Sequence, residues 1–277
     1  MIPVFDIRTL PTETYLKPVI VDQYTIISIT KAQGSYSLDF EKREVNSSTW
    51  IYLTPGQLYA QELSHTQGVM ITFNESFLFK TALEKDYLQE HPLFHETFHP
   101  TYVEYEVIDQ TNLDIILKLL NQEWNKEVKS EVILKSYLCI LLELSQRLCK
   151  SYREIGFGKE KTDPRSAILL KQIEKSFSTH HDAQYYAKYL ELTIKRANQI
   201  CKESTGHSIT ELIHKRLNLE MKKRVGYSSD LIHKIASDLS FRDNAYFSTF
   251  FKKQNNCAPM EFRAESHNFE IGNRNNN

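Results

Sequence analysis

The chain has 277 residues, 41% hydrophobic and 25% charged, with a net charge of −1. These are ordinary values for a globular protein, and no apolar run reaches the ~18 residues that a membrane-spanning helix needs. The sequence begins without a charged and apolar leader, and its four cysteines are widely spaced with no C-x-x-C pair. We therefore expect a reduced, cytoplasmic protein of two domains, without a disulfide frame or a zinc ribbon.

Charge is divided unevenly along the chain. Residues 164–266 contain 17 Lys and Arg against 11 Asp and Glu, whereas residues 1–163 contain 16 against 23. A basic third joined to an acidic two-thirds favours an anionic partner for the C-terminal part. Chance surface charge explains the same split about as well.

Residues 1–108 are predicted to form a β-rich domain. Short segments rich in β-branched and aromatic residues occur at 24–30, 35–40, 50–55, 58–63 and 68–73. Gly34, Pro55-Gly56 and Thr66-Gln67-Gly68 separate them, and this regular spacing is typical of a small barrel or sandwich. A short helix is expected from Asn74 to about Gln89, and residues 101–108 alternate like one more strand.

Five aromatic residues on the predicted strands are candidates for an effector pocket. Such side chains can bind a small apolar or sugar-like ligand, but filling of the core is the better-supported interpretation. The candidates are Tyr24, Tyr36, Trp50, Tyr52 and Tyr59.

Residues 109–155 are predicted to be a helical segment. Its second helix, at 130–152, has one apolar stripe at 134, 138 and 142 and a further one beside it, which together are wider than a one-sided surface helix needs. The further stripe is a candidate dimerisation face, with an ordinary buried helix as the alternative. Its members are Ile133, Tyr137, Ile140, Leu141, Leu144 and Leu148.

A linker is expected at residues 156–163, which contain glycines and charges. Asp163-Pro164 then suits a helix start, with Asp as the N-cap. Residues 164–266 are predicted to be entirely helical, and residues 267–277 to be a disordered tail.

One short pattern occurs twice in the helical third, at 183–206 and 231–256. Ala187 matches Ala236, and Leu190 matches Leu239. Each copy predicts a helix, a turn of about four residues and a second helix, the arrangement of a helix-turn-helix unit.

Capping residues support these boundaries. Asp182 and Thr193 suit the two helix starts of the first copy, while Ser229 or Asp230 and then Asp243 suit those of the second. Between the copies, Ser208 and Glu211 form a capping box that predicts a long helix over 208–225. This helix would hold the two units at a fixed separation.

The second helix of each copy leaves polar residues on its outer face, free to enter a DNA major groove. Asn and Gln pair with adenine, Arg and Lys with guanine, and Ala contacts the thymine methyl group. Taken singly, each position is better explained as a solvated one, and the doubled arrangement is what favours DNA. The candidate DNA-binding residues are Lys195, Arg196, Asn198, Gln199, Lys202, Arg242, Asn244, Ala245, Ser248, Thr249, Lys252 and Lys253.

Residues 235–263 resemble the C-terminal signature of AraC/XylS-type transcription regulators, IA…GF.D.SYF…FKK..G.TP..YR, and residues 201–223 resemble the family's junction between its two units. The N-terminal part is similar, more weakly, to the family's cupin-like sensor domains. The signature matches at Ile235, Ala236, Phe241, Asp243, Tyr246, Phe247, Phe251, Lys252, Lys253, Pro259, Phe262 and Arg263.

The resemblance implies an α+β protein with a cupin-like β-barrel sensor at 1–108, a helical dimerisation segment at 109–155 and a DNA-binding domain at 164–266. It further implies a homodimeric activator that binds double-stranded DNA and RNA polymerase and responds to an effector, with no cofactor. The sequence departs from the pattern at four positions. Ser240 and Asn256 stand where the family has Gly, Ala197 where it has Leu, and Thr249 where it often has Arg.

The sequence also offers two enzyme classes as alternatives. The segment HETFH at 95–99 fits the H-E-x-x-H zinc pattern, but Pro92 and Pro100 disrupt the helix that this motif needs, which leaves a loop whose histidines bind a metal weakly at most. A cupin enzyme needs a cluster of His and carboxylate ligands inside the barrel, and the segments at 24–73 contain only His65. We expect no metal site and no catalytic residue. The main alternative is a helical protein-interaction module without DNA binding.

Overall fold

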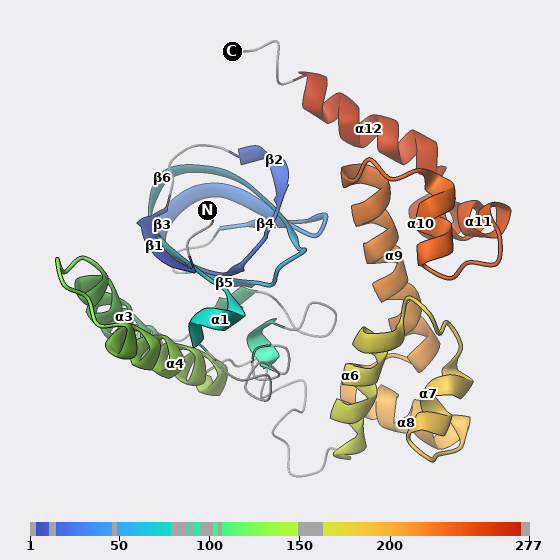
Figure 1. Cartoon of the computed structure of the whole chain (residues 1–277), viewed down its shortest axis with the longest axis horizontal. Helices are drawn as coiled ribbons and strands as arrows, with labels where there is room; N and C mark the ends of the chain where they lie inside the picture. Colours follow the sequence, from blue (N-terminus) through green and yellow to red (C-terminus); the bar gives the residue numbers. More distant parts are fainter. Residues whose placement is uncertain are drawn as a thin grey trace. The chain divides into compact units, whose positions relative to one another are not determined.

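A computed structural model describes residues 4–10, 15–45, 49–78, 88, 91–94, 102–104, 107–148 and 163–272. The chain divides into two compact units, Met1–Gly158 and Lys159–Asn277. The first combines a sheet with helices and the second is helical over its described residues, so the protein is mixed α+β (Figure 1). The segment 95–99 and almost all of the expected linker lie outside the described residues.

The sheet of the first unit has seven antiparallel strands. Its main path runs β1-β6-β3-β5-β7, while β2 pairs with β6 and β4 pairs with β3. Among the described strands no pairing joins β1 to β7, so the expected barrel is not closed by its strands. The bounds are β1 Phe5–Thr9, β2 Tyr15–Ile20, β3 Tyr24–Leu38, β4 Glu41–Glu44, β5 Thr49–Leu53, β6 Leu58–Phe73 and β7 Tyr102–Glu104.

Two long, bent strands replace four of the short strands expected from the sequence. Segments 24–30 and 35–40 belong to β3, and segments 58–63 and 68–73 belong to β6. A Cβ atom on Gly34 would lie 2.0 Å from the carbonyl oxygen of Glu62, and one on Gly68 would lie 2.3 Å from that of Ser28. These glycines therefore allow the two backbones to approach closely at the bend, rather than ending a strand.

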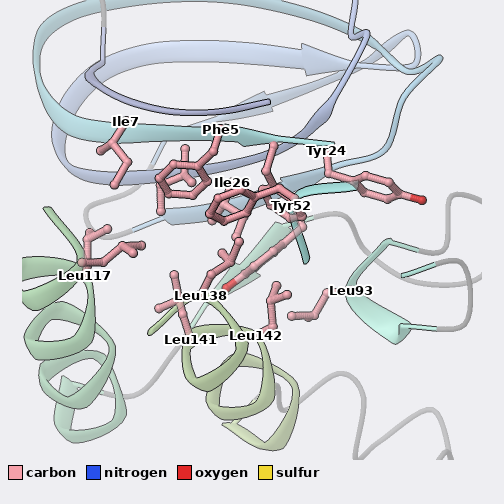
Figure 2. Packing of buried hydrophobic residues seen from close by; sticks show 14 of the residues in the cluster. Phe5, Ile7, Tyr24, Ile26, Tyr52, Leu93, Leu117, Leu138, Leu141 and Leu142 are labelled. Carbon is pink, nitrogen blue, oxygen red and sulfur yellow. The ribbon is translucent and has the colours of Figure 1, made fainter. Parts of the chain in front are cut away.

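Helices α3 (Val107–Trp124) and α4 (Glu131–Leu148) cover one face of the sheet, with α1 (Glu75–Leu78) and the 3-10 turn η1 (Pro92–Phe94) beside them. Figure 2 shows Leu138, Leu141 and Leu142 of α4 directed at the aromatic and aliphatic side chains of the strands. All three are fully buried, and burial of one such side chain stabilises the fold by about 1.5–3 kcal/mol. The sheet and these two helices therefore share one core.

Over its described residues, 163–272, the second unit consists of seven helices. Its last helix is assigned to Gly272, beyond residue 267, where the sequence predicts the start of a disordered tail. The bounds are α6 Arg165–Ser176, α7 Ala183–Tyr189, α8 Ile194–Thr205, α9 Ile209–Tyr227, α10 Ile232–Asp238, α11 Asn244–Asn255 and α12 Pro259–Gly272.

Candidate nucleic-acid interface

Side-chain caps fix where the second helix of each unit begins. The hydroxyl of Thr193 accepts the backbone N–H of Arg196 at 3.3 Å, and the carboxylate of Asp243 accepts that of Tyr246 at 2.7 Å. Helices α8 and α11 consequently start 50 residues apart at matching positions. Asp182 caps α7 in the same way, as predicted from the sequence.

The predicted cap of α10 is wrong. Its N-cap is Leu231, which provides no side-chain acceptor. Asp230 instead accepts from Arg224 at 2.9 Å and from Lys234 at 2.7 Å. This carboxylate therefore ties α10 to the end of α9, because its two cationic partners lie on those two helices.

The turns between the paired helices have the same backbone geometry. Glu191 and Ser240 both have a φ of 55°, in the left-handed region. The next residue in each turn donates its N–H to an alanine carbonyl at 2.9 Å, from Leu192 to Ala187 and from Phe241 to Ala236. A left-handed backbone conformation costs a non-glycine residue roughly 1–2 kcal/mol in free energy. Both units retain it, so the tight turn governs the direction of both second helices.

One face of each second helix is buried. Ala197 and Cys201 of α8 and Phe247 and Phe251 of α11 are fully buried. The aromatic rings of α11 also pack on their neighbours, with Phe247 edge to face with Phe241 at 5.1 Å between ring centres. The opposite faces of α8 and α11 are therefore fixed in their outward orientation.

The outward faces carry the residues predicted to contact DNA. Residues Lys195, Gln199 and Lys202 follow one another at i, i+4 and i+7 along α8, which places them on one stripe. Ala245, Thr249 and Lys252 form the matching stripe of α11, and all six are exposed. Arg242, Asn244 and Lys253 are exposed beside them, Arg196, Asn198 and Ser248 are half-buried, and none of the twelve is buried.

The cations on these faces differ from those inside the unit. Arg216 and Arg224 pair with acidic side chains, Arg216 with Glu174 at 2.9 Å and Arg224 with Asp230 at 2.9 Å. The four lysines of the outward faces, by contrast, make no ion pair with any residue that the structure describes. These lysines therefore contribute positive charge to the two outward faces that no described acidic side chain offsets through an ion pair. These lysines are Lys195, Lys202, Lys252 and Lys253.

The two candidate arginines both have carboxylate partners. Arg196 lies 3.4 Å from Asp163, which also accepts from Arg165 at 2.6 Å. Hydrogen bonds from Arg165 to this carboxylate, with a smaller effect of the Arg196 charge, lower the pKa of Asp163 to about 2. Arg242 donates its Nε to Asp243 at 3.0 Å but remains largely exposed. Arg196 is therefore the more restrained of the two.

Asn198 has a structural partner that the sequence did not predict. Its Oδ1 accepts the backbone N–H of Ile209, the first residue of α9, at 3.0 Å. The matching residues of the second unit are Ser248 and Pro259, and proline has no N–H to satisfy. The side-chain oxygen of Asn198 therefore links α8 to the start of α9 through this hydrogen bond.

Three further side chains of the outward faces were missed. Glu203 of α8 is exposed and accepts from Gln199 Nε2 at 2.8 Å, while Ile194 and Tyr246 are about half exposed on the first turns of α8 and α11. Aligning only the second helices of the two copies, α8 and α11, at their offset of 50 residues would have revealed them. That alignment pairs Glu203 with Lys253, a reversal of charge between the units.

The five aromatic residues proposed for an effector pocket do not come together. Tyr24, Trp50 and Tyr52 lie in the core beneath α3 and α4, whereas Tyr36 and Tyr59 lie in a second apolar cluster of the sheet. All five are buried, which agrees with core filling. The hydroxyl of Tyr24 points away from the core in Figure 2 and donates to Glu75 at 3.3 Å, at the edge of an open hollow of about 450 Å³.

The residues proposed for dimerisation divide between core and surface. Leu141 is fully buried and cannot contact a partner, because it points into the core between α4 and the sheet. Tyr137, Leu144 and Leu148 are partly buried against the same core. Ile133 and Ile140 remain exposed by 40% and 44%, and Val132 beside them by 73%.

No helix within the described ranges is long and apolar enough to cross a bilayer. The same part of the chain has no group of three or more His, Cys, Asp or Glu side chains arranged to hold a metal ion.

Comparison with known proteins gives matches of the regulator type. A family model described as a helix-turn-helix domain matches residues 186–265. The HTH-type transcriptional activator RhaS of Mannheimia succiniciproducens is 25% identical over 164 residues, 59% of this chain and 60% of that protein. The alignment therefore spans less than two thirds of that relative. The activator RhaR of the same organism is 20% identical over 242 residues, 86% of this chain and 84% of its own. Among solved structures, ToxT from Vibrio cholerae has a TM-score of 0.42 and 18% identity, covering 94% of this chain and 98% of its own.

Proposed function

We propose that this chain is a sequence-specific DNA-binding transcription regulator of the AraC type, because a helix-turn-helix family model matches residues 186–265 and the sequence there resembles the AraC/XylS signature. The observation that carries the proposal is the pair of capped helices, α8 and α11, each anchored by a buried face. Each presents an exposed stripe ending in a lysine that makes no ion pair with any residue in the described part of the chain. A major groove is wide enough to admit such a helix.

The two stripes suggest different contributions to recognition. The stripe of α8 carries Lys195, Gln199 and Lys202, whose long side chains can reach base edges, with Lys pairing to guanine and Gln to adenine. The stripe of α11 carries the small residues Ala245 and Thr249, which suit a thymine methyl group, before Lys252. The first helix-turn-helix unit would supply most of the hydrogen-bonded base recognition. The second would add apolar contact and binding to phosphates.

The N-terminal unit of the chain, residues 1–158, would have a regulatory role. A cupin-like sheet covered by two helices would sense an effector, and the exposed patch of Val132, Ile133 and Ile140 on α4 would contact a second copy. The two relatives named above are transcriptional activators, which favours activation through RNA polymerase over repression. The protein would act as a homodimer without a cofactor.

The proposal is tested by selecting duplexes from a random pool with the full chain, then measuring affinity at several salt concentrations. We expect an enriched sequence and an affinity that falls steeply with salt, because lysines that bind phosphates release counterions. A matched pair of variants separates the two kinds of contact. Gln199→Ala should broaden the selected sequence, while Lys252→Ala should weaken all duplexes about equally.

The result that would contradict the proposal is equally direct. If the folded full chain enriches no sequence and binds no duplex at low salt, the helical unit does not recognise DNA. It would then be better explained as a protein-interaction module.

A further inference from the structure

The two helix-turn-helix units meet at a small cluster of rings. His181, directly before the first helix of the first unit, has its ring centre 5.2 Å from that of Phe241 in the turn of the second unit. His214 of α9 lies 5.0 Å from Phe250 of α11, edge to face at 82°. Phe241 and Phe250 are 5.6 Å apart. We refer to these four residues, His181, His214, Phe241 and Phe250, as the joint.

The joint bears directly on the second recognition helix. Phe241 packs on Phe247, the fully buried residue that anchors α11, and Phe250 belongs to α11 itself. His181 lies at the start of the first helix-turn-helix unit, and His214 lies on α9, the helix between the two helix-turn-helix units. The two imidazoles therefore lie among the side chains through which the first helix-turn-helix unit and α9 contact α11 and the turn before it.

The surroundings of both imidazoles oppose a positive charge. Burial lowers the pKa of His181, and it lowers that of His214, whose pKa is lowered further by His181 and by Lys253 of α11. Neighbouring His180 also disfavours a charged His181. The backbones of Ser178 and Leu239 and the carboxylate of Asp182 act in the opposite direction on His181, and burial outweighs them.

We propose that His181 and His214 are positioning residues that hold the second recognition helix in place relative to the first only while both rings are neutral. Protonation would put two positive charges into a half-buried contact that already faces Lys253, and it would favour separation of the rings from Phe241 and Phe250. The aromatic faces attract a cation only weakly at such sites, by roughly 0.5–1 kcal/mol.

The direction of the pH effect follows from linkage. A lowered pKa means that the closed joint binds fewer protons than the open one, so the joint is strongest above the ordinary histidine pKa of 6.5 and weakens as the pH falls below it. At pH 5.5, one unit below that value, the open form can gain up to about tenfold for each histidine. The consequence for DNA rests on the proposed function. A site that needs both helices should lose affinity, while a site that needs only α8 should not.

The experiment begins with hydrogen exchange of the full chain without DNA, at pH 7.5 and 5.5, corrected for intrinsic exchange rates. Three proteins are compared: the wild type, the double variant His181→Gln/His214→Gln, and the control His233→Gln, which removes an exposed histidine of α10. Protection of residues 232–255 should fall at pH 5.5 in the wild type and the control, by up to about 100-fold for two histidines. The double variant should show no such change. An NMR titration of the two wild-type imidazoles serves if the double variant does not fold.

Protection that is unchanged between the two pH values in the wild type, or histidines that titrate together with exposed ones, would overturn the proposal. The DNA arm uses a duplex selected by the full chain at pH 7.5 and the same duplex with one half scrambled. The affinity ratio of the two duplexes should fall at pH 5.5 only in proteins that retain both histidines. If the joint opens with pH but no duplex is ever bound, the proposed function fails while the positioning role stands.

Discussion

Replacement of Asn198 separates a structural role from base reading. In the structure its Oδ1 accepts the N–H of Ile209 at the start of α9, and Ile209 is fully buried. Asn198→Ala leaves that N–H without an acceptor. A buried donor left unpaired destabilises a protein by about 1–3 kcal/mol, and loss of a helix cap by about 1 kcal/mol. We therefore expect the free energy of unfolding of the helical C-terminal unit, residues 159–277, to fall by about 1–2 kcal/mol.

The second helix-turn-helix unit offers a matched control. Ser248 occupies the corresponding position on α11, and Pro259 stands where Ile209 stands, so no N–H is present to be satisfied. Ser248→Ala should change the unfolding free energy by less than about 0.5 kcal/mol, as is usual for a substitution outside such features.

The assay is urea unfolding followed by two signals. Both tryptophans, Trp50 and Trp124, lie in the first unit, so their fluorescence reports on that unit alone, whereas far-UV circular dichroism also follows the helices of the second. Asn198→Ala should shift the helical transition to lower urea and leave the fluorescence transition in place. If it shifts neither signal, or if Ser248→Ala is equally destabilising, the capping role of Asn198 is refuted.

Four further outcomes are expected. Ser240→Gly should stabilise the helical C-terminal unit by about 1 kcal/mol in the same urea assay, because glycine adopts the observed φ of 55° without strain. Lys252→Ala should reduce the slope of log affinity against log salt by about 1 for every duplex tested. Gly34→Ala should destabilise the first unit by more than about 2 kcal/mol by tryptophan fluorescence, because its Cβ would meet the Glu62 carbonyl oxygen at 2.0 Å. Ile140→Glu should weaken self-association in sedimentation, since it charges the exposed apolar patch of α4.

The helix boundaries of the C-terminal unit could be predicted from the sequence, because the capping residues that set them act over a few neighbouring positions. The caps at Asp182, Thr193 and Asp243 and the capping box of Ser208 are all formed in the structure, as spacing predicted. Such hydrogen bonds connect residues three positions apart, so the sequence alone contains both partners. The cap at Asp230 failed because its carboxylate is taken by Arg224, which the sequence alone does not place beside it.

Features that depend on distant residues were harder to predict. Gly34 and Gly68 resemble turn residues, and only the strand that crosses them shows that they permit close backbone approach. Leu141 shares a predicted stripe with exposed residues but is buried in the core, because it lies three residues after Leu138 on the face of α4 that packs on the sheet. The hydrogen bond from Ile209 to Asn198 likewise joins two helices whose contact is set by tertiary packing.

Because α9 holds the two helix-turn-helix units at a fixed separation, we propose that α8 and α11 enter successive major grooves on one side of the duplex. Hydroxyl-radical footprinting of the full chain on a selected duplex tests this most directly. The account predicts two protected patches on one face, with centres about 10 base pairs, or roughly 34 Å, apart. A single patch in the wild type at neutral pH, or uniform protection without that period, would contradict it.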